Sequence, residues 1–476
     1  MITGAFLAMF KQKGRNLDYT ALGIAVITLG LTLLAVFSGE PGVDLVHITD
    51  LMCLKLRVDD IGRLFAILTS FMWVMAIMFS FEYMDHEGHK TRFYSFMLLS
   101  LGVSVGLPMA GNIITTYTFY ELLTVLSMPL VIHSYSREAI EAGKKYLMYS
   151  FFGASLVLTG FLFLNHFGTT LDFTPGGVLD MAKVAGRENL VLLLFVLMFI
   201  GFSVKAGMFP LHAWLPAAHP IAPAPASALL SGVITKAGVV AIIRVTFYLF
   251  GADFVSGTWA HTGLLALSLV SIFLGSMLAY KENHFKRRLA YSSVSQLSYI
   301  LFGIIILSTN GLTGALMHVV AHSAIKVTLF FVAGVLIFKA EIHHVDEVTG
   351  LGKSMPITMW CYSLVSLGLI GIPPTTGYVS KWFLAQGSLG LANQVLAYGG
   401  AAILLISALL TAGYLIPIFT DAFFPGKDFD YSSVKKLEPG VTTLAPMIIL
   451  TAITLLVGMF PGPVLAFISN ITKLLF

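Results

Sequence analysis

The chain has 476 residues, of which 57% are hydrophobic and only 11% are charged, and its formal net charge is +4. No soluble fold covers that much apolar surface, so the composition predicts an all-α polytopic membrane protein with no soluble domain and no nucleic-acid partner. Cys53 and Cys361 lie far apart in the sequence, so we expect no disulfide, no metal site and no cofactor in this chain.

Fourteen apolar segments are the predicted helices. About 20 apolar residues cover the roughly 30 Å of hydrocarbon in a bilayer, and most of the segments are that long. The first is too short to span alone, so we expect a neighbour or local bilayer thinning to complete it. The segments are approximately 1–10, 19–37, 61–84, 93–111, 112–134, 143–165, 190–209, 226–250, 259–280, 290–308, 312–338, 356–382, 393–419 and 441–470.

The distribution of basic residues agrees with this count and gives an orientation. Loops that follow odd-numbered segments hold 17 of the 28 Lys and Arg residues, the opposite side holds 6, and five lie inside spans. The positive-inside rule then puts the first set of loops in the cytoplasm. We therefore expect a multi-pass protein of the inner (plasma) membrane with both termini outside, and no cleavable signal peptide.

Proline interrupts two of the segments. The seventh ends at Pro210, and the twelfth is cut by the stretch from Gly371 to Pro374. Interrupted helices at corresponding places in two halves indicate inverted repeats with ion sites at the breaks. The predicted domains are helices 1–3 (1–92), a first five-helix repeat (93–250), a second five-helix repeat (259–419) and a C-terminal helix (441–476).

Charged residues inside the spans are the functional candidates. A charge in hydrocarbon costs several kcal/mol, roughly, so such residues are functional by default. Among the 24 acidic residues only Glu121 falls in the middle of a span. The bases inside spans are Lys205, Lys236, Arg244, Lys326 and Lys381.

Glu121 and Lys205 are the first candidate pair. A lysine removed from water holds its proton weakly, and a nearby carboxylate strengthens that hold. Moving the carboxylate away would make the lysine release its proton, which is a usable switch. The alternative is a static ion pair that locks two helices together, although such a pair is seldom more stable than apolar packing.

His318, His322 and Lys326 are spaced at i, i+4 and i+8, so they are expected on one face of a helix. Histidine titrates near neutral pH and can pass protons in either direction. The alternative is a pair of core histidines with satisfied hydrogen bonds. Metal binding by two histidines would need a third ligand, which the sequence does not show.

Each of the remaining polar residues or clusters has two possible roles. Lys381 follows the proline break and is either a proton carrier or a lysine that extends to the membrane edge. Arg244 cannot release a proton at ordinary pH, so we expect it to bind a carbonyl or a lipid headgroup. Asp85, His86, Glu87 and His89 form a charged loop rather than a metal site.

Several motifs follow one another along the chain. They are Tyr120-Glu121-Leu122, Lys205-Ala-Gly-Met-Phe-Pro-Leu-His-Ala-Trp-Leu-Pro216, Ala218-His-Pro with Ser227 to Gly238, His318-x3-His322-x3-Lys326, Gly350-Leu-Gly-Lys-Ser-Met-Pro356, and Gly371-Ile-Pro-Pro to Lys381. With these motifs the chain resembles, from about residue 60 to 420 and in the same order, the antiporter-like subunits shared by respiratory complex I, Mrp-type Na+/H+ antiporters and membrane-bound hydrogenases.

The resemblance implies roles for the buried residues. Glu121 and Lys205 would form a switch, Lys236 and His322 a middle relay, and Lys381 the far station of a mid-membrane proton path. Lysine at the last position is similar to the N-type subunit of complex I and to the D-type subunit of Mrp antiporters. The chain departs from the family at its N-terminus, which looks trimmed, and it lacks the lateral helix of the L-type.

We therefore expect a proton-translocating subunit of a larger membrane complex, with proton relay residues Glu121, Lys205, Lys236, His318, His322, Lys326 and Lys381. The implied partners are other membrane subunits, and the chain would be the non-redox part of an oxidoreductase-type or Mrp-type assembly. The alternatives are a structural anchor with an inactive channel, a subunit that exchanges Na+ for protons, and a transporter that works alone. No carboxylate cluster suited to Na+ stands inside the spans, which favours protons.

Overall fold

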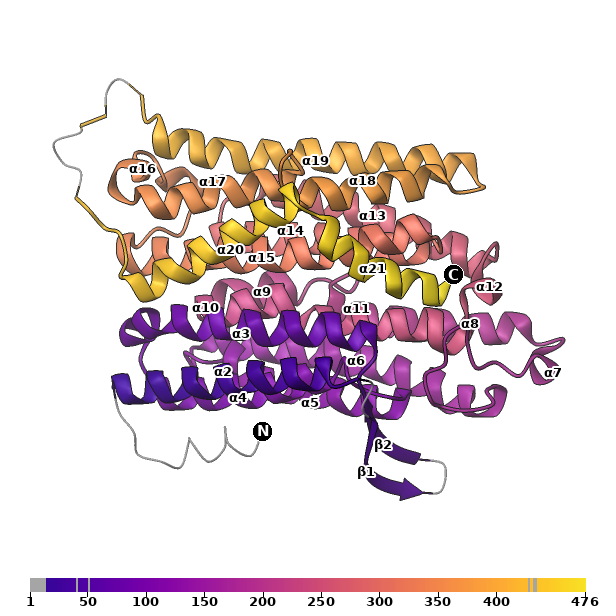
Figure 1. Ribbon diagram of the computed structural model, residues 1–476. Coiled ribbons are helices and arrows are strands. Elements are labelled where there is room, and N and C mark those ends of the chain that lie inside the picture. The colour runs from indigo at the N-terminus through magenta and orange to yellow at the C-terminus, as the bar shows by residue number, and fades with distance from the viewer. Residues whose placement is uncertain (1–13, 40–41, 50–51, 427–428, 431–434) are drawn as a thin grey trace.

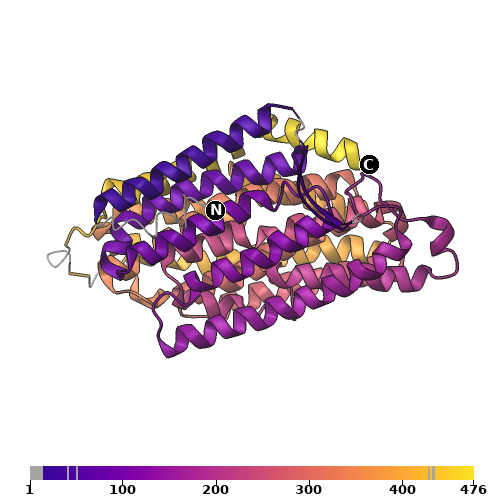
Figure 2. The ribbon, with the colours of Figure 1, turned by 90° about the horizontal axis from the view of Figure 1, so that it is seen from below.

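The computed structural model describes residues 14–39, 42–49, 52–426, 429–430 and 435–476, so the predicted helix at 1–10 lies outside the described residues. Its helices lie side by side with their axes roughly aligned (Figure 1, Figure 2). The N-terminal elements are α2 (Arg15–Phe37), β1 (Gly42–Thr49), β2 (Met52–Arg57), α3 (Asp60–Glu87), α4 (Lys90–Gly106), α5 (Ile113–Val131), α6 (Arg137–Phe167), α7 (Met181–Val184) and α8 (Glu188–Ala206).

The central and C-terminal elements continue the same bundle, and the yellow C-terminal helices lie across its front in Figure 1. The central elements are α9 (Leu215–Ile221), α10 (Ala224–Leu229), η1 (Leu230–Ile234), α11 (Lys236–Ile243), η2 (Arg244–Phe250), α12 (Ala252–Val255), α13 (Trp259–Lys281), α14 (Phe285–Ile305) and α15 (Thr309–Ala340). The C-terminal elements are η3 (Val345–Glu347), α16 (Leu351–Ser354), α17 (Pro356–Ile370), α18 (Thr376–Leu389), α19 (Gln394–Phe423), α20 (Val441–Met459) and α21 (Gly462–Leu475).

Ten helices in the described part of the chain are long and apolar enough to cross a membrane. A bilayer offers no hydrogen-bond partners, and a helix satisfies its backbone internally, which is why these apolar segments are helical. The mostly helical, polytopic membrane fold is thus confirmed. The count of fourteen spans remains a prediction.

The interruption after the seventh predicted span is present. The helix α8 ends at Ala206, four residues before Pro210, because Gly207 takes the left-handed conformation (φ 71) and its N–H returns to the last turn. The Trp214 indole then donates to the Val204 carbonyl at 2.8 Å and fixes the turn against α8. The chain continues through α9 into the buried run α10–η1–α11–η2, in which η1 and η2 are π-helical.

The break in the twelfth predicted span is also present, since α17 ends at Ile370 and α18 begins at Thr376.

The predicted continuous helix at 441–470 is wrong. It forms two helices, α20 and α21, that meet at Pro461. Phe460 leaves the helical conformation (φ −125, ψ 66) just before Pro461, and proline is favoured at the start of the new helix because it needs no N–H there.

The fold is not purely α-helical, because the stretch between α2 and α3 forms an antiparallel hairpin of β1 and β2. The fold-class prediction was wrong on this point. Cys53, Lys55 and Arg57 alternate with Leu54 and Leu56, and that period of two is typical of a strand with one face packed. The alternation is visible in the sequence, but it is short beside the long apolar segments on either side.

Two buried ion pairs hold ends of the helices in place. Arg244, at the start of η2, makes a two-pronged contact with Asp59, and its Nη2 lies 2.7 Å from Asp59 Oδ1. The same nitrogen lies 3.3 Å from the Pro108 carbonyl, so the expected carbonyl contact is present together with a carboxylate that the sequence did not indicate. At the other end of α3, Lys90 donates to both oxygens of the buried Asp18 at 2.8 and 3.0 Å.

The first prediction concerns Asp59, which also caps α3 by accepting the Gly62 N–H at 2.9 Å. Asp59→Ala removes this cap and leaves the buried Arg244 unpaired, so we expect a loss of about 3–5 kcal/mol of stability. The matched control is Asp60→Ala, which removes a partly exposed pair with Arg63 worth about 1 kcal/mol or less. Thermal unfolding in detergent measures both, and equal midpoints would contradict the anchoring role.

Candidate functional site

Lys205 lies in the last turn of α8, fully buried, and faces α5. Its Nζ donates to Thr124 Oγ1 at 2.7 Å and approaches the Tyr120 carbonyl at 3.5 Å. The ammonium also lies over the Tyr120 ring, 4.5 Å from its centroid, where a cation is attracted to the face of the ring. Hence Lys205 is held by a hydroxyl, a carbonyl and an aromatic ring.

Among the described residues Glu121 forms no ion pair with Lys205, whose amine donates to Thr124 instead. Tyr120 and Thr124 are four residues apart and share one face of α5, whereas Glu121 is turned about 100° to the side. Glu121 Oε1 is buried and has no hydrogen-bond partner among the described residues. In the described residues the predicted pair is therefore not a closed ion pair.

Lys236 and His322 are in direct contact, with Lys236 Nζ 2.6 Å from His322 Nδ1. Lys236 begins α11, directly after the π-helical η1, and its Nζ also donates to the Ser231 carbonyl at 2.7 Å. π-helical turns are frequent at functional sites. Both side chains are buried, and His322 Nε2 has no partner in the described chain, so this nitrogen can accept or donate another hydrogen bond.

His318 extends the contact toward α18. Its ring centroid lies 6.1 Å from that of His322, and its Nδ1 lies 2.9 Å from Ser380 Oγ. The ring also stacks on Tyr299 at 5.6 Å. His318 Nε2, like His322 Nε2, has no hydrogen-bond partner among the described residues.

Lys381 turns inward at the second break, which favours a role in the site over an extension to the membrane edge. Its Nζ donates to the carbonyls of Leu369 and Ile370 at 2.7 and 2.8 Å. These are the last carbonyls of α17, where the helix dipole attracts a positive charge. Lys381 also lies over the Tyr299 ring at 5.1 Å, on the residue that His318 stacks on.

Lys326 does not lie in line with His318 and His322. Its Nζ contacts Ser292 Oγ and the Leu289 carbonyl, both on α14. An α-helix advances 100° per residue, so position i+8 is rotated about 80° from position i. The three residues thus form an oblique stripe, with the histidines facing α11 and α18 and Lys326 facing α14.

The polar axis, defined as Glu121, Lys205, Lys236, His322, His318 and Lys381, therefore crosses helices α5, α8, α11, α15 and α18. In Figure 1, α5 lies lowest, α8 and α11 lie at about the same height above it, and α15 and then α18 lie higher. Lys205 and Lys236 lie on neighbouring helices, since α11 packs on α8 at Gly238, where an added Cβ would come within 2.5 Å of the Phe202 carbonyl. All the relay residues expected from the sequence lie on this axis except Lys326.

His219 and Lys286 were not expected from the sequence. His219, on α9, is fully buried with neither ring nitrogen paired within the described residues, and its ring stacks on Phe330 at 4.7 Å. Lys286, on α14, donates to the Ala222 carbonyl at 2.9 Å, directly after α9. The Ala218-His-Pro motif contains the signal that could have identified His219.

Comparisons with known proteins show what the whole chain is similar to. The family model described as "NADH:quinone oxidoreductase/Mrp antiporter, TM" matches residues 110–411. The chain is 29% identical to the N-type subunit of NADH-quinone oxidoreductase from Desulforudis audaxviator over 439 residues, covering 88% of this chain and 84% of that protein. It is 27% identical to the D-type subunit of the Na(+)/H(+) antiporter from Alkalihalophilus pseudofirmus over 469 residues, covering 97% and 92%.

A solved structure shows the same fold. A chain of the Mrp complex from Dietzia sp. DQ12-45-1b superposes with a TM-score of 0.86 at 19% identity, covering 100% of this chain and 95% of the other.

The second prediction separates buried lysines that have a carboxylate partner from those that do not. Lys236→Met removes a base with no carboxylate within ion-pair distance in the described residues. An unpaired buried base costs stability, so we expect Lys236→Met to unfold at the same temperature as the wild type or higher. The matched control, Lys90→Met, leaves the buried Asp18 without its principal partner and is expected to unfold at a lower temperature. A large destabilisation by Lys236→Met would assign this lysine a purely structural role.

Proposed function

The chain belongs to the NADH:quinone oxidoreductase/Mrp antiporter transmembrane family, and we propose that, as an antiporter-like subunit of a larger membrane complex, it carries protons along the polar axis. The observation that carries this proposal is the contact between Lys236 and His322 at 2.6 Å in the middle of the bundle. Two proton-binding groups in direct contact, without a carboxylate to fix a charge, can exchange a proton.

Electrostatics limits the Lys236–His322 dyad to one excess proton. Two unit charges 2.6 Å apart would repel by about 6 kcal/mol at an effective dielectric constant of about 20. A proton that arrives at Lys236 is therefore shared with His322 through Nδ1. It can leave through His322 Nε2, because imidazole binds a proton on one nitrogen and releases one from the other.

The Glu121–Lys205 pair would gate entry to this dyad. Lys205 is held by Thr124 and Tyr120, so a movement of Glu121 changes its electrostatic environment without breaking its hydrogen bond. When Glu121 moves away, Lys205 holds its proton less strongly and passes it toward Lys236. Beyond the dyad, the proton continues over His318 to Lys381, with water bridging the gaps.

The partners of this chain are other membrane subunits, and any redox reaction is proposed to take place in them. Cys53 lies on the hairpin and Cys361 on α17, which supports placing any iron–sulfur cluster in the partner subunits. Protons are favoured over Na+ as the cargo because the axis is built of amines and imidazoles, with Glu121 as its one described carboxylate, whereas hard cations prefer oxygen ligands.

The third prediction tests the axis in the assembled complex. Glu121→Gln and Lys205→Met are expected to reduce proton transport by at least about tenfold, since each additional 1.4 kcal/mol, roughly, on a barrier slows a step by that factor. The measurement is dye-reported acidification of vesicles that contain the complete complex. Glu141→Gln and Lys353→Met, which change exposed residues of the same types, should leave transport unchanged. Normal transport in both axis variants would favour a structural anchor instead.

We infer fourteen spans, with inverted five-helix repeats at 93–250 and 259–419 and both termini outside. The break between α8 and α10 in the first half and the break between α17 and α18 in the second half support the repeats. The excess of Lys and Arg in the loops that follow odd-numbered helices supports the orientation.

The fourth prediction tests this orientation with a matched pair of exposed basic residues. In a background without Cys53 and Cys361, Lys183→Cys, on α7, should react with a membrane-impermeant maleimide only in right-side-out vesicles. Arg137→Cys, at the start of α6, should react only in inverted vesicles. The two positions lie at opposite ends of α6 and its following loop, so the reverse labelling pattern would overturn the orientation.

A further inference from the structure

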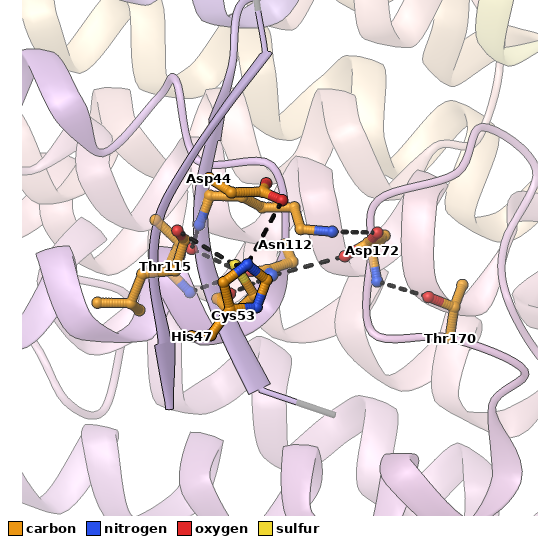
Figure 3. Close-up of polar contacts among 9 residues, drawn as sticks. Asp44, His47, Cys53, Asn112, Thr115, Thr170 and Asp172 are labelled. Carbon is orange, nitrogen blue, oxygen red and sulfur yellow. Dashed lines mark hydrogen bonds and ion pairs between the residues drawn. The ribbon is translucent and has the colours of Figure 1, made fainter. Parts of the chain in front are cut away.

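Three potential metal ligands gather on one face of the β1–β2 hairpin: Asp44, His47 and Cys53 (Figure 3). Asp44 and His47 are three residues apart, so in a regular strand they would point to opposite faces. A register shift between Asp44 and Val46 places an extra residue in β1 and returns the two side chains to the same face. Cys53 completes the group because it pairs with His47 across the hairpin.

The distances among these ligand atoms are close to those of a metal site. Cys53 Sγ lies 3.9 Å from His47 Nε2, and this nitrogen lies 3.9 Å from Asp44 Oδ2. All three ligand atoms are within 4.8 Å of one another. Bonds of about 2.0–2.3 Å to a tetrahedral zinc ion place ligand atoms about 3.4–3.6 Å apart, so small side-chain rotations suffice.

The surroundings of the three ligands keep them in place and leave room for a fourth. The Asn112 amide donates to the Cys53 carbonyl at 2.7 Å and fixes that strand against the start of α5. Lys55, which lines the same hollow, is paired with Asp172 at 2.7 Å. The ligands line a hollow of about 420 Å³ between the hairpin and the 168–172 loop.

We propose that this hairpin binds a zinc ion, or another borderline-soft divalent cation, through Asp44, His47 and Cys53, with water as the fourth ligand. Thiolate with imidazole selects zinc-like ions, whereas Mg²⁺ and Ca²⁺ require more oxygen ligands than this site offers. As the metal–sulfur bond forms, the Cys53 thiol releases its proton to water. The site shares no residue with the polar axis, so each proposal can fail without the other.

Cobalt is the probe for the test, because a thiolate bound to Co²⁺ gives a charge-transfer absorption band. We expect the purified full-length chain to bind one Co²⁺ with this band and to lose the band when Zn²⁺ is added. Cys53→Ser should abolish the band, and His47→Gln and Asp44→Asn should weaken binding by about tenfold or more, since even indirect contacts to a metal contribute that much. Cys361→Ser, which removes the thiol on α17, is the matched control and should bind normally.

A second measurement needs no change at the site. In Cys361→Ser, Zn²⁺ should slow the reaction of Cys53 with a maleimide, and Mg²⁺ at the same concentration should not. The proposal is overturned if the wild type shows no thiolate band, if Cys53→Ser retains it, or if Zn²⁺ does not protect Cys53.

Discussion

The constraint on which this structure depends is the placement of bases in an apolar bundle with almost no carboxylates to pair with them. A buried amine without a counter-charge is costly as a cation and must find hydrogen bonds in either protonation state. In this structure, backbone carbonyls accept these hydrogen bonds from the buried amines. Lys236, Lys326 and Lys381 each donate to at least one carbonyl, on Ser231, on Leu289, and on Leu369 with Ile370, respectively. A carbonyl stabilises the ammonium and still accepts a bond from the neutral amine, so the proton is not locked in place.

The helix breaks follow from the same requirement. A continuous α-helix uses its carbonyls internally, and only its last four lack partners. The end of α17 supplies such carbonyls to Lys381. The π-helical turn of η1 precedes Lys236 and places the Ser231 carbonyl within reach of its amine. The interruptions therefore supply polar groups at a depth where side chains alone would be too costly. By contrast, Asp59 and Asp18 fix Arg244 and Lys90 at helix ends, and such closed pairs hold helices together without storing a mobile proton.

Much of the polar axis could be predicted from the sequence, because a charged residue within an apolar span is rare enough to be informative by itself. Lys205, Lys236, His322 and Lys381 are identifiable in that way. Thr124 could not be identified from the sequence, because threonine is common in helices and only the contact with Lys205 in the structure shows its role. The separation of Glu121 from Lys205 could not be foreseen for a related reason. Sequence positions show which residues share a helix, but the rotation of α5 against α8 decides which of them meet.

The rotation of an α-helix also explains why the three residues of the His318–His322–Lys326 motif contact different neighbouring helices. Residues at i, i+4 and i+8 drift by about 40° at each step, so a long stripe on one helix faces different neighbours at its two ends. On α15, His318 faces α18, His322 faces α11 and Lys326 faces α14. A strict repeat of 3.6 residues would have kept all three side chains on one neighbouring helix. The oblique stripe lets a single helix contact Lys236 on one side and Ser380 of α18 on another, while Lys326 contacts α14.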